Sequence, residues 1–210
     1  MHTKQYILSG KDIKDVSKVL IMVHGRGATA ESILNIADYL KVDDFTLLAP
    51  QATNQTWYPY SFLAPSSQNE PWLGSALGLL KEIVAELHKK NIDSKNIYFL
   101  GFSQGACLTL EFVTRNAARY GAVIAFTGGL IGDKIDPANY KGNFSGTPVF
   151  LGSSDPDPHV PVERVNDTET ILTNMNARVT KKIYEYMGHT INPEEIAFAN
   201  KLITGEAVTS

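Results

Sequence analysis

Short apolar segments alternate with amphipathic segments through most of the chain. The apolar segments are rich in β-branched and aromatic residues, which is typical of strands. Several are apolar at nearly every position, as expected of strands buried on both faces of a mostly parallel sheet. The predicted strands are 19–23, 45–49, 96–100, 122–126, 148–151 and 182–186, with an edge strand at 6–9.

The amphipathic segments repeat their apolar residues at helical spacing. Segment 71–90 is the longest of them, and Pro71 suits its first turn. The alternation of strands and helices predicts an α/β fold with a mostly parallel central sheet and helices on both faces. The other predicted helices are 29–40, a helix directly after Gly101, 162–175 and 193–202.

Residues 51–72 fit neither the strand period nor the helix period. This segment contains five aromatic residues, including both tryptophans of the chain. Connections of this length inside a compact domain are uncommon and tend to carry function. We therefore expect the aromatic-rich segment 51–72 to lie over the functional site.

Composition excludes several classes of protein. The chain has 22 acidic and 19 basic side chains, a balance that leaves no basic face for nucleic acid. Cys107 is the single cysteine and no Cys/His spacing resembles a zinc site, so we expect no metal and a reducing compartment. The first 18 residues lack a continuous apolar run, so we expect no membrane association and a cytoplasmic protein. A length of 210 residues suits one domain, 1–210.

Residues 101–105, Gly-Phe-Ser-Gln-Gly, match the pattern G-x-S-x-G of a nucleophile elbow. A strand-like run leads into the match and a helix-like run leads out, as the elbow requires. The sharp turn exposes the hydroxyl of Ser103, and glycine at 101 and 105 avoids side-chain collisions. The alternative is a glycine-rich turn in which Ser103 only caps the helix.

A serine nucleophile needs a base and an acid, which follow it in the chain in the order acid, then histidine. The histidines after Ser103 are His159 and His189. His189 is favoured as the base because it follows the last predicted strand, whereas His159 shares a short loop with the acid candidates. Those candidates are Asp155 and Asp157, and both could instead make only local turn hydrogen bonds.

The negatively charged oxygen that forms when serine attacks an acyl group needs two N–H donors. Gln104, the residue after Ser103, offers the first. Arg26, in the glycine-rich loop after strand 19–23, offers the second. The alternative is an ordinary strand-to-helix turn, and His24 is expected to hold this loop rather than to act as base.

The aromatic-rich segment offers side chains for an apolar acyl or alcohol pocket. The candidates are Trp57, Tyr58, Phe62 and Leu63, which could equally form a packed flap with no role in specificity. The Arg26 side chain is expected either to place a cation at the pocket mouth or to be solvated.

Four blocks of sequence together resemble the phospholipase/carboxylesterase family of α/β hydrolases, relatives of the acyl-protein thioesterases. They are Val-His-Gly-Arg-Gly at 23–27, the elbow at 101–105, Asp-Pro-His-Val-Pro at 157–161 and Gly-His at 188–189. The resemblance covers nearly the whole chain. It implies a minimal α/β-hydrolase domain that hydrolyses carboxylic esters, often of short to medium acyl length, without a cofactor.

Position by position, the resemblance implies Ser103 as nucleophile, His189 as base and Asp157 as acid. Asp157 is preferred because the family's acid is the aspartate of an Asp-Pro-x-Val-Pro block. Two features depart from the acyl-protein thioesterases: Arg26 replaces their usual leucine, and the loop that begins at Trp57 differs. The bacterial-type carboxylesterases are therefore the closer match.

We accordingly expect a serine carboxylesterase that acts on small to medium-chain esters through an acyl-enzyme. One alternative is a thioesterase acting on acyl-thiols or acylated proteins. Another, from a different class, is a hydrolase-like binding protein without turnover. The expected partner is a small-molecule ester, and the protein is expected to be a monomer or a homodimer.

Overall fold

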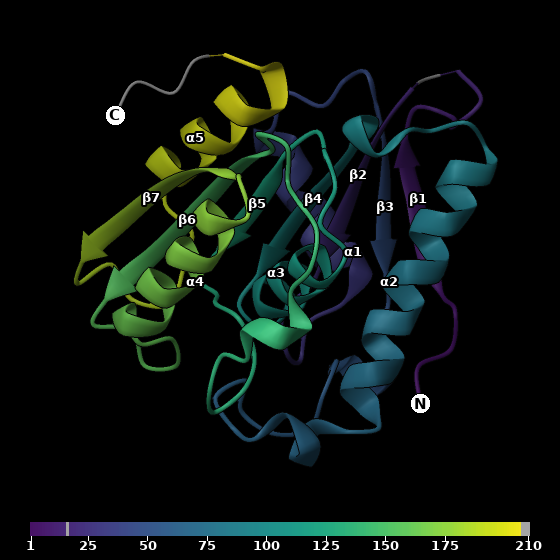
Figure 1. Ribbon diagram of the computed structural model, residues 1–210. Helices are drawn as coiled ribbons and strands as arrows, with labels where there is room; N and C mark the ends of the chain where they lie inside the picture. Colours follow the sequence, from purple (N-terminus) through teal and green to yellow (C-terminus); the bar gives the residue numbers. More distant parts are fainter. Residues whose placement is uncertain (16, 207–210) are drawn as a thin grey trace.

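The computed structural model describes residues 1–15 and 17–206. Within these residues seven strands form one sheet: β1 (Tyr6–Gly10), β2 (Lys18–Val23), β3 (Phe45–Pro50), β4 (Ile97–Phe102), β5 (Val123–Phe126), β6 (Pro148–Asp155) and β7 (Arg178–Glu185). Their order across the sheet is β1-β3-β2-β4-β5-β6-β7 (Figure 1). β1 runs antiparallel to β3, and all other neighbours are parallel.

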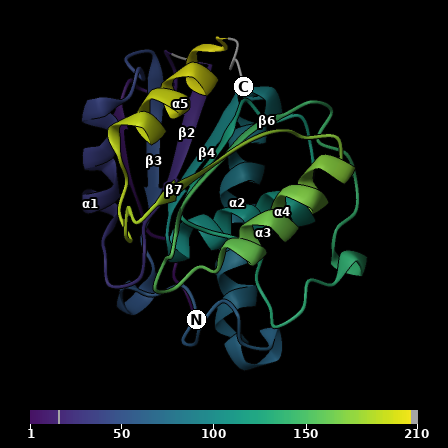
Figure 2. The ribbon, with the colours of Figure 1, turned by 90° about the vertical axis from the view of Figure 1, so that its left-hand side faces the viewer.

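Helices cover both faces of the sheet. In the described part of the chain the α-helices are α1 (Ala30–Leu34), α2 (Trp72–Lys89), α3 (Gln104–Arg115), α4 (Val162–Asn174) and α5 (Pro193–Thr204). Figure 2 shows α2, α3 and α4 on one face, and α1 and α5 on the other. The predicted α/β fold, a mostly parallel sheet between two helical layers, is confirmed.

The two faces of the sheet form two separate apolar cores, as β2 illustrates. Val19, Ile21 and Val23 belong to the core under α2, α3 and α4. Leu20 and Met22 belong to the core under α1 and α5. Because successive side chains of a strand point to opposite faces, a strand covered on both sides must be apolar throughout.

Two strands are longer than the apolar pattern predicts. β7 begins at Arg178, four residues before the predicted start, because the edge of the sheet is only half-buried and tolerates its polar residues. β6 continues to Asp155, and its last four residues pair with β7. Asp155 therefore ends a strand and does not lie in the loop that follows.

The predicted helix 29–40 is also different in the structure. Helix α1 ends at Leu34, and a tighter 3-10 helix, Asn35–Tyr39, continues the segment. Asn35 and Asp38 are weak helix formers whose side chains compete for backbone hydrogen bonds, which favours this break. No helix among the described residues is long and apolar enough to cross a bilayer.

Candidate active site

The loops that follow β2, β4, β6 and β7 meet at one edge of the sheet. Parallel strands all end at the same edge, so residues far apart in the chain come together there. This edge brings together Ser103 after β4, Asp157 after β6 and His189 after β7. The chemistry of the site depends on how these loops are held.

Ser103 lies on a strained turn between β4 and α3. Its φ of 53° and ψ of −120° fall in a region that non-glycine residues rarely occupy. Its N–H donates to the carbonyl of Phe126, which ties the turn to β5 at 3.0 Å. A Cβ on Gly101 would lie 2.5 Å from the Gly105 carbonyl oxygen, and one on Gly105 would lie 2.1 Å from the Val23 carbonyl oxygen. Both positions therefore require glycine.

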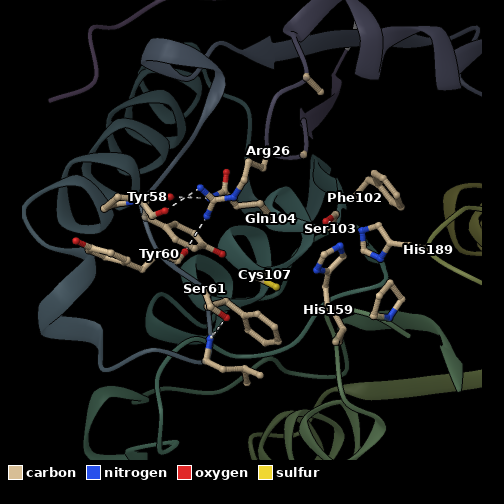
Figure 3. Close-up of a pocket in the computed structure, with 17 residues that line it drawn as sticks. Arg26, Tyr58, Tyr60, Ser61, Phe102, Ser103, Gln104, Cys107, His159 and His189 are labelled. Carbon is tan, nitrogen blue, oxygen red and sulfur yellow. Dashed lines mark hydrogen bonds between the residues drawn. The ribbon is translucent and has the colours of Figure 1, made fainter. Parts of the chain in front are cut away.

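His189 links Ser103 to Asp157. Its Nε2 atom lies 2.8 Å from Ser103 Oγ, and its Nδ1 atom lies 2.9 Å from Asp157 Oδ2. Figure 3 shows the His189 side chain next to Ser103. A neutral ring with its proton on Nδ1 donates to the carboxylate and leaves Nε2 to accept from the serine hydroxyl. Asp157 Oδ1 also accepts the N–H groups of His159 and Val160, each at 2.8 Å.

The electrostatics of Asp157 suit a permanently charged acid. Burial by itself would raise the pKa of the carboxyl, whose side chain is fully buried. The N–H groups of His159 and Val160 and the His189 ring outweigh burial, so the pKa of Asp157 lies below its ordinary value. The carboxylate therefore stays ionised at neutral pH and orients the His189 ring.

The loops that carry the acid and the histidine are bonded to each other. Ser154 Oγ accepts the Gly188 N–H at 3.0 Å, directly before His189. The Tyr186 N–H donates to the Asp155 carbonyl at 3.1 Å, which extends the pairing of β6 and β7 by one step. The position of the histidine is thus fixed by a side chain and a backbone carbonyl of the neighbouring strand β6.

Two backbone N–H groups beside Ser103 are available for an oxyanion. They belong to Gln104, at the start of α3, and to Arg26, in the loop after β2. The hydrogen bonds of the described residues include none from either group. The Arg26 loop passes directly beside the serine, because a Cβ on Gly25 would lie 3.6 Å from Ser103 Cβ.

His24 supports this loop from beneath. It is fully buried, its Nδ1 atom lies 2.7 Å from the Gly25 carbonyl oxygen, and its Nε2 atom accepts the Ala52 N–H at 3.1 Å. Burial lowers the pKa of His24, which keeps the ring neutral. His24 therefore fixes the Arg26 loop and takes no part in the Ser103–His189 pair.

The side chains of Arg26 and Gln104 hold the aromatic-rich segment. The Arg26 guanidinium donates to Thr56 Oγ1 at 3.0 Å and to the carbonyls of Pro59 and Tyr60 at 3.0 and 2.7 Å. Arg26 is exposed and lines the pocket, so its cation lies at the pocket as one expectation had it, and the same side chain also clamps the loop.

Gln104 binds the same segment with its side-chain amide. Its Oε1 atom accepts the Trp57 N–H at 2.9 Å, and its Nε2 atom donates to the Tyr58 carbonyl at 2.9 Å. The amide thus accepts one hydrogen bond from the loop backbone and donates one to it. Nothing in the sequence pattern signals either of these side-chain contacts.

A cavity of about 650 Å³ opens beside Ser103. Tyr58, Phe62 and Leu63 line it, as predicted from the aromatic-rich segment. Cys107 and His159 also line it, and the His159 ring packs edge-on against the His189 ring with 5.0 Å between centroids. Sequence reasoning did not assign either of these residues to the pocket.

Trp57 does not line this pocket. It is fully buried in the core, and its indole N–H donates to the His24 carbonyl at 2.8 Å. The ring packs against the His24 ring with 5.0 Å between centroids. Tyr58, the next residue, lines the pocket, whereas Trp57 packs beneath the loop.

Comparison with known proteins places the chain in a family. The family model of phospholipases and carboxylesterases matches residues 4–205. The chain belongs to this family. It is therefore a serine hydrolase with the α/β-hydrolase fold, as the four sequence blocks implied.

Relatives cover most of the chain. Acyl-protein thioesterase 1 of Kluyveromyces lactis is 25% identical over 198 residues, which are 85% of this chain and 87% of the relative. A probable carboxylesterase of Oryza sativa subsp. japonica is 25% identical over 199 residues, 84% of this chain and 73% of the relative. The crystal structure of a phospholipase/carboxylesterase from Dyadobacter fermentans is 53% identical, covers 97% of both chains and gives a TM-score of 0.95.

Proposed function

We propose that the chain is a serine carboxylesterase in which Ser103, His189 and Asp157 form a catalytic triad. One observation carries the proposal: His189 lies within hydrogen-bond distance of both Ser103 Oγ and Asp157 Oδ2, 2.8 and 2.9 Å away. A serine that only capped α3 would have no need of this arrangement, and its side chain makes no capping bond to the helix.

In this mechanism Ser103 Oγ attacks the ester carbonyl carbon while His189 Nε2 takes the hydroxyl proton. The N–H groups of Gln104 and Arg26, which make no hydrogen bond among the described residues, hold the oxyanion. The imidazolium then gives its proton to the departing alcohol, leaving an acyl-enzyme. Water, activated by the same ring, releases the acid.

The cavity supports small to medium-chain esters as substrates. Its volume of about 650 Å³ falls in the range of small-molecule sites, and Phe62 and Leu63 give it apolar walls. The relative named acyl-protein thioesterase 1 favours a second candidate, hydrolysis of thioesters. The values of kcat/KM for matched oxygen and sulfur esters of one acyl group separate the two activities.

The decisive variant is Ser103→Ala. It is expected to reduce kcat for p-nitrophenyl esters by a factor on the order of 10⁴ or more, because triad members act as a unit. Ser9→Ala, which changes an exposed serine on β1, is the matched control and should retain full activity. Retention of hydrolysis by Ser103→Ala would reject the mechanism.

A second measurement tests the alternative of a binding protein without turnover. A fluorophosphonate should label the wild-type chain and fail to label Ser103→Ala, since only an activated serine reacts. Folded wild-type protein that resists labelling would favour the binding protein.

A further inference from the structure

His2 bonds both ends of a strained turn in the aromatic-rich segment. Asn54 and Gln55 form the turn, and their φ angles of 55° and 57° lie in the left-handed region that residues other than glycine rarely adopt. Thr53 precedes the turn, and its N–H donates to His2 Nδ1 at 3.1 Å. Trp57 lies two residues after the turn, and its carbonyl accepts from His2 Nε2 at 2.9 Å. Backbone strain of this kind persists only where surrounding contacts hold it, and His2 supplies two of these contacts.

The two hydrogen bonds fix the protonation of the His2 ring. An N–H group can only donate and a carbonyl can only accept, so Nδ1 is unprotonated and Nε2 carries the proton. Burial lowers the pKa of His2, which favours this neutral form. The hydrogen bonds of the described residues give the Thr53 N–H and the Trp57 carbonyl no other partner. A neutral His2 ring is therefore what joins these two backbone groups.

The start of α2 holds His2 in place. The first residues of the chain lie beside this end of the helix (Figure 1), where the His2 N–H donates to Ser75 Oγ at 2.9 Å. The His2 ring packs against two indoles, with centroid distances of 5.4 Å to Trp57 and 5.2 Å to Trp72. Because α2 is a regular helix of 18 residues, His2 ties the strained turn to a rigid element.

The same segment contacts the loop that carries Arg26. The Gln55 carbonyl, within the turn, accepts the Gly27 N–H at 2.7 Å. The Trp57 indole donates to the His24 carbonyl at 2.8 Å. Arg26, whose N–H is proposed above as an oxyanion donor, thus has a residue bonded to segment 53–57 on each side of it in the chain. A displacement of this segment would therefore displace the donor.

We infer that His2 is a positioning residue for the oxyanion site: it holds segment 53–57 in its strained form, and this segment holds the backbone of 24–27 beside Ser103. The inference rests on the proposed esterase function. The residues that line the pocket do not include His2, so its effect on the reaction comes through the position of the backbone and not through contact with the substrate.

This role predicts a particular kinetic effect. An oxyanion forms during both acylation and deacylation, so a displaced donor slows both steps by a similar factor. The value of kcat then falls while KM stays the same, because the lost interaction is made only in the transition state. The loss should also be the same for short and long acyl groups.

The test separates the ring nitrogens of His2 from its aromatic packing. His2→Phe keeps a ring against Trp57 and Trp72 and removes both hydrogen bonds to the segment. His2→Gln removes the ring and keeps an N–H donor for the Trp57 carbonyl. The control is His88→Phe, because His88 is exposed on α2 and its ring bonds only Ser94 among the described residues.

Values of kcat and KM are measured for p-nitrophenyl acetate and p-nitrophenyl hexanoate. Active sites are counted by complete fluorophosphonate labelling, below the unfolding temperature of each variant, so that unfolded protein does not lower kcat. His2→Phe should lower kcat about tenfold for both esters, a smaller loss than the roughly 10² to 10³-fold effect of removing an oxyanion donor outright. Both KM values should change less than about twofold. His2→Gln should recover most of the lost kcat, and His88→Phe should match the wild type.

Three results would overturn the inference while hydrolysis by the wild type upholds the esterase. One is an unchanged kcat per labelled site in His2→Phe, even with a lower unfolding temperature, because the role of His2 would then be structural only. Another is a loss of kcat in His2→Gln that equals or exceeds the loss in His2→Phe, because ring packing would then matter and the hydrogen bonds would not. The third is an altered preference between the two esters, which would assign His2 to the shape of the pocket.

Wild-type protein that hydrolyses neither ester would instead reject the proposed function, and the inference with it. The two failures are therefore distinguishable in one set of measurements.

Discussion

Glu195, a buried carboxyl at the start of α5, makes the stability of the fold depend on pH. Its side chain has no exposed surface. One oxygen accepts the Asn192 N–H at 2.9 Å in a capping box, and the other has no hydrogen-bond partner among the described residues. The second oxygen lies over Gly152, where a Cβ would approach it to 2.1 Å. Burial raises the pKa of Glu195 from 4.5 to about 7.

The size of the effect follows from this shift. Between pH 4.5 and about 7 the folded chain holds a proton on Glu195 that the unfolded chain has released. The free energy of unfolding therefore falls by about 1.4 kcal/mol per pH unit in this range and levels off above it. Over the whole range the free energy of unfolding falls by about 3 kcal/mol, so the fold is more stable when Glu195 is protonated.

Glu195→Gln removes the charge and keeps an acceptor for the Asn192 N–H. The new amide group has no partner, which adds a constant destabilisation of about 1 kcal/mol at every pH. Urea unfolding of the variant and the wild type should therefore show a stability difference that moves in favour of the variant by about 2 to 3 kcal/mol between pH 5 and pH 9.

Taking the difference cancels the titration of groups shared by both proteins. Glu163→Gln is the control, because Glu163 is exposed in the first turn of α4 and its removal should give a nearly constant difference. A stability difference for Glu195→Gln that does not change with pH would refute the reasoning. A stability difference that moves in favour of the wild type as pH rises would also refute it.

Two further substitutions test the elbow and the loop clamp. Gly105→Ala should destabilise the fold by about 3 kcal/mol in urea unfolding, since its Cβ would lie 2.1 Å from the Val23 carbonyl oxygen. The control is Gly78→Ala in α2, which should be neutral or stabilising because its Cβ would have no atom within 4 Å. Equal stabilities would refute the predicted collision. Arg26→Met removes three hydrogen bonds to loop 56–60 and should lower kcat/KM about tenfold, and unchanged steady-state kinetics would contradict the clamp.

The features that were predictable are those encoded by neighbouring residues. Apolar runs such as β2 must be buried on both faces, and the pattern of 101–105 specifies a sharp turn by the sizes of its residues. Each of these two patterns can be recognised from a few consecutive residues. The sequence order of serine, acid and histidine then limits the candidates to a few residues.

The features that were not predictable depend on contacts between distant segments. The Arg26 clamp, the Gln104 amide contacts and the position of Tyr58 at the pocket all involve loop 56–60, which has no periodic pattern of its own. Trp57 was expected in the pocket for the same reason: composition identifies an aromatic loop but does not say which ring faces inward. The choice between Asp155 and Asp157 likewise needed more than local pattern, because β6 extends to Asp155 by pairing with β7.

Arg26 and Gln104 each serve two neighbours at once. Their backbone N–H groups lie beside Ser103, and their side chains hold the carbonyls of residues 58–60. A mutation that moves the backbone of loop 56–60 would therefore also displace Arg26 and Gln104, and with them the N–H groups beside Ser103. Divergence of substrate range, in evolution or in the laboratory, is therefore expected to proceed by exchanging side chains at positions such as Phe62 and Leu63, with insertions and deletions in the loop selected against.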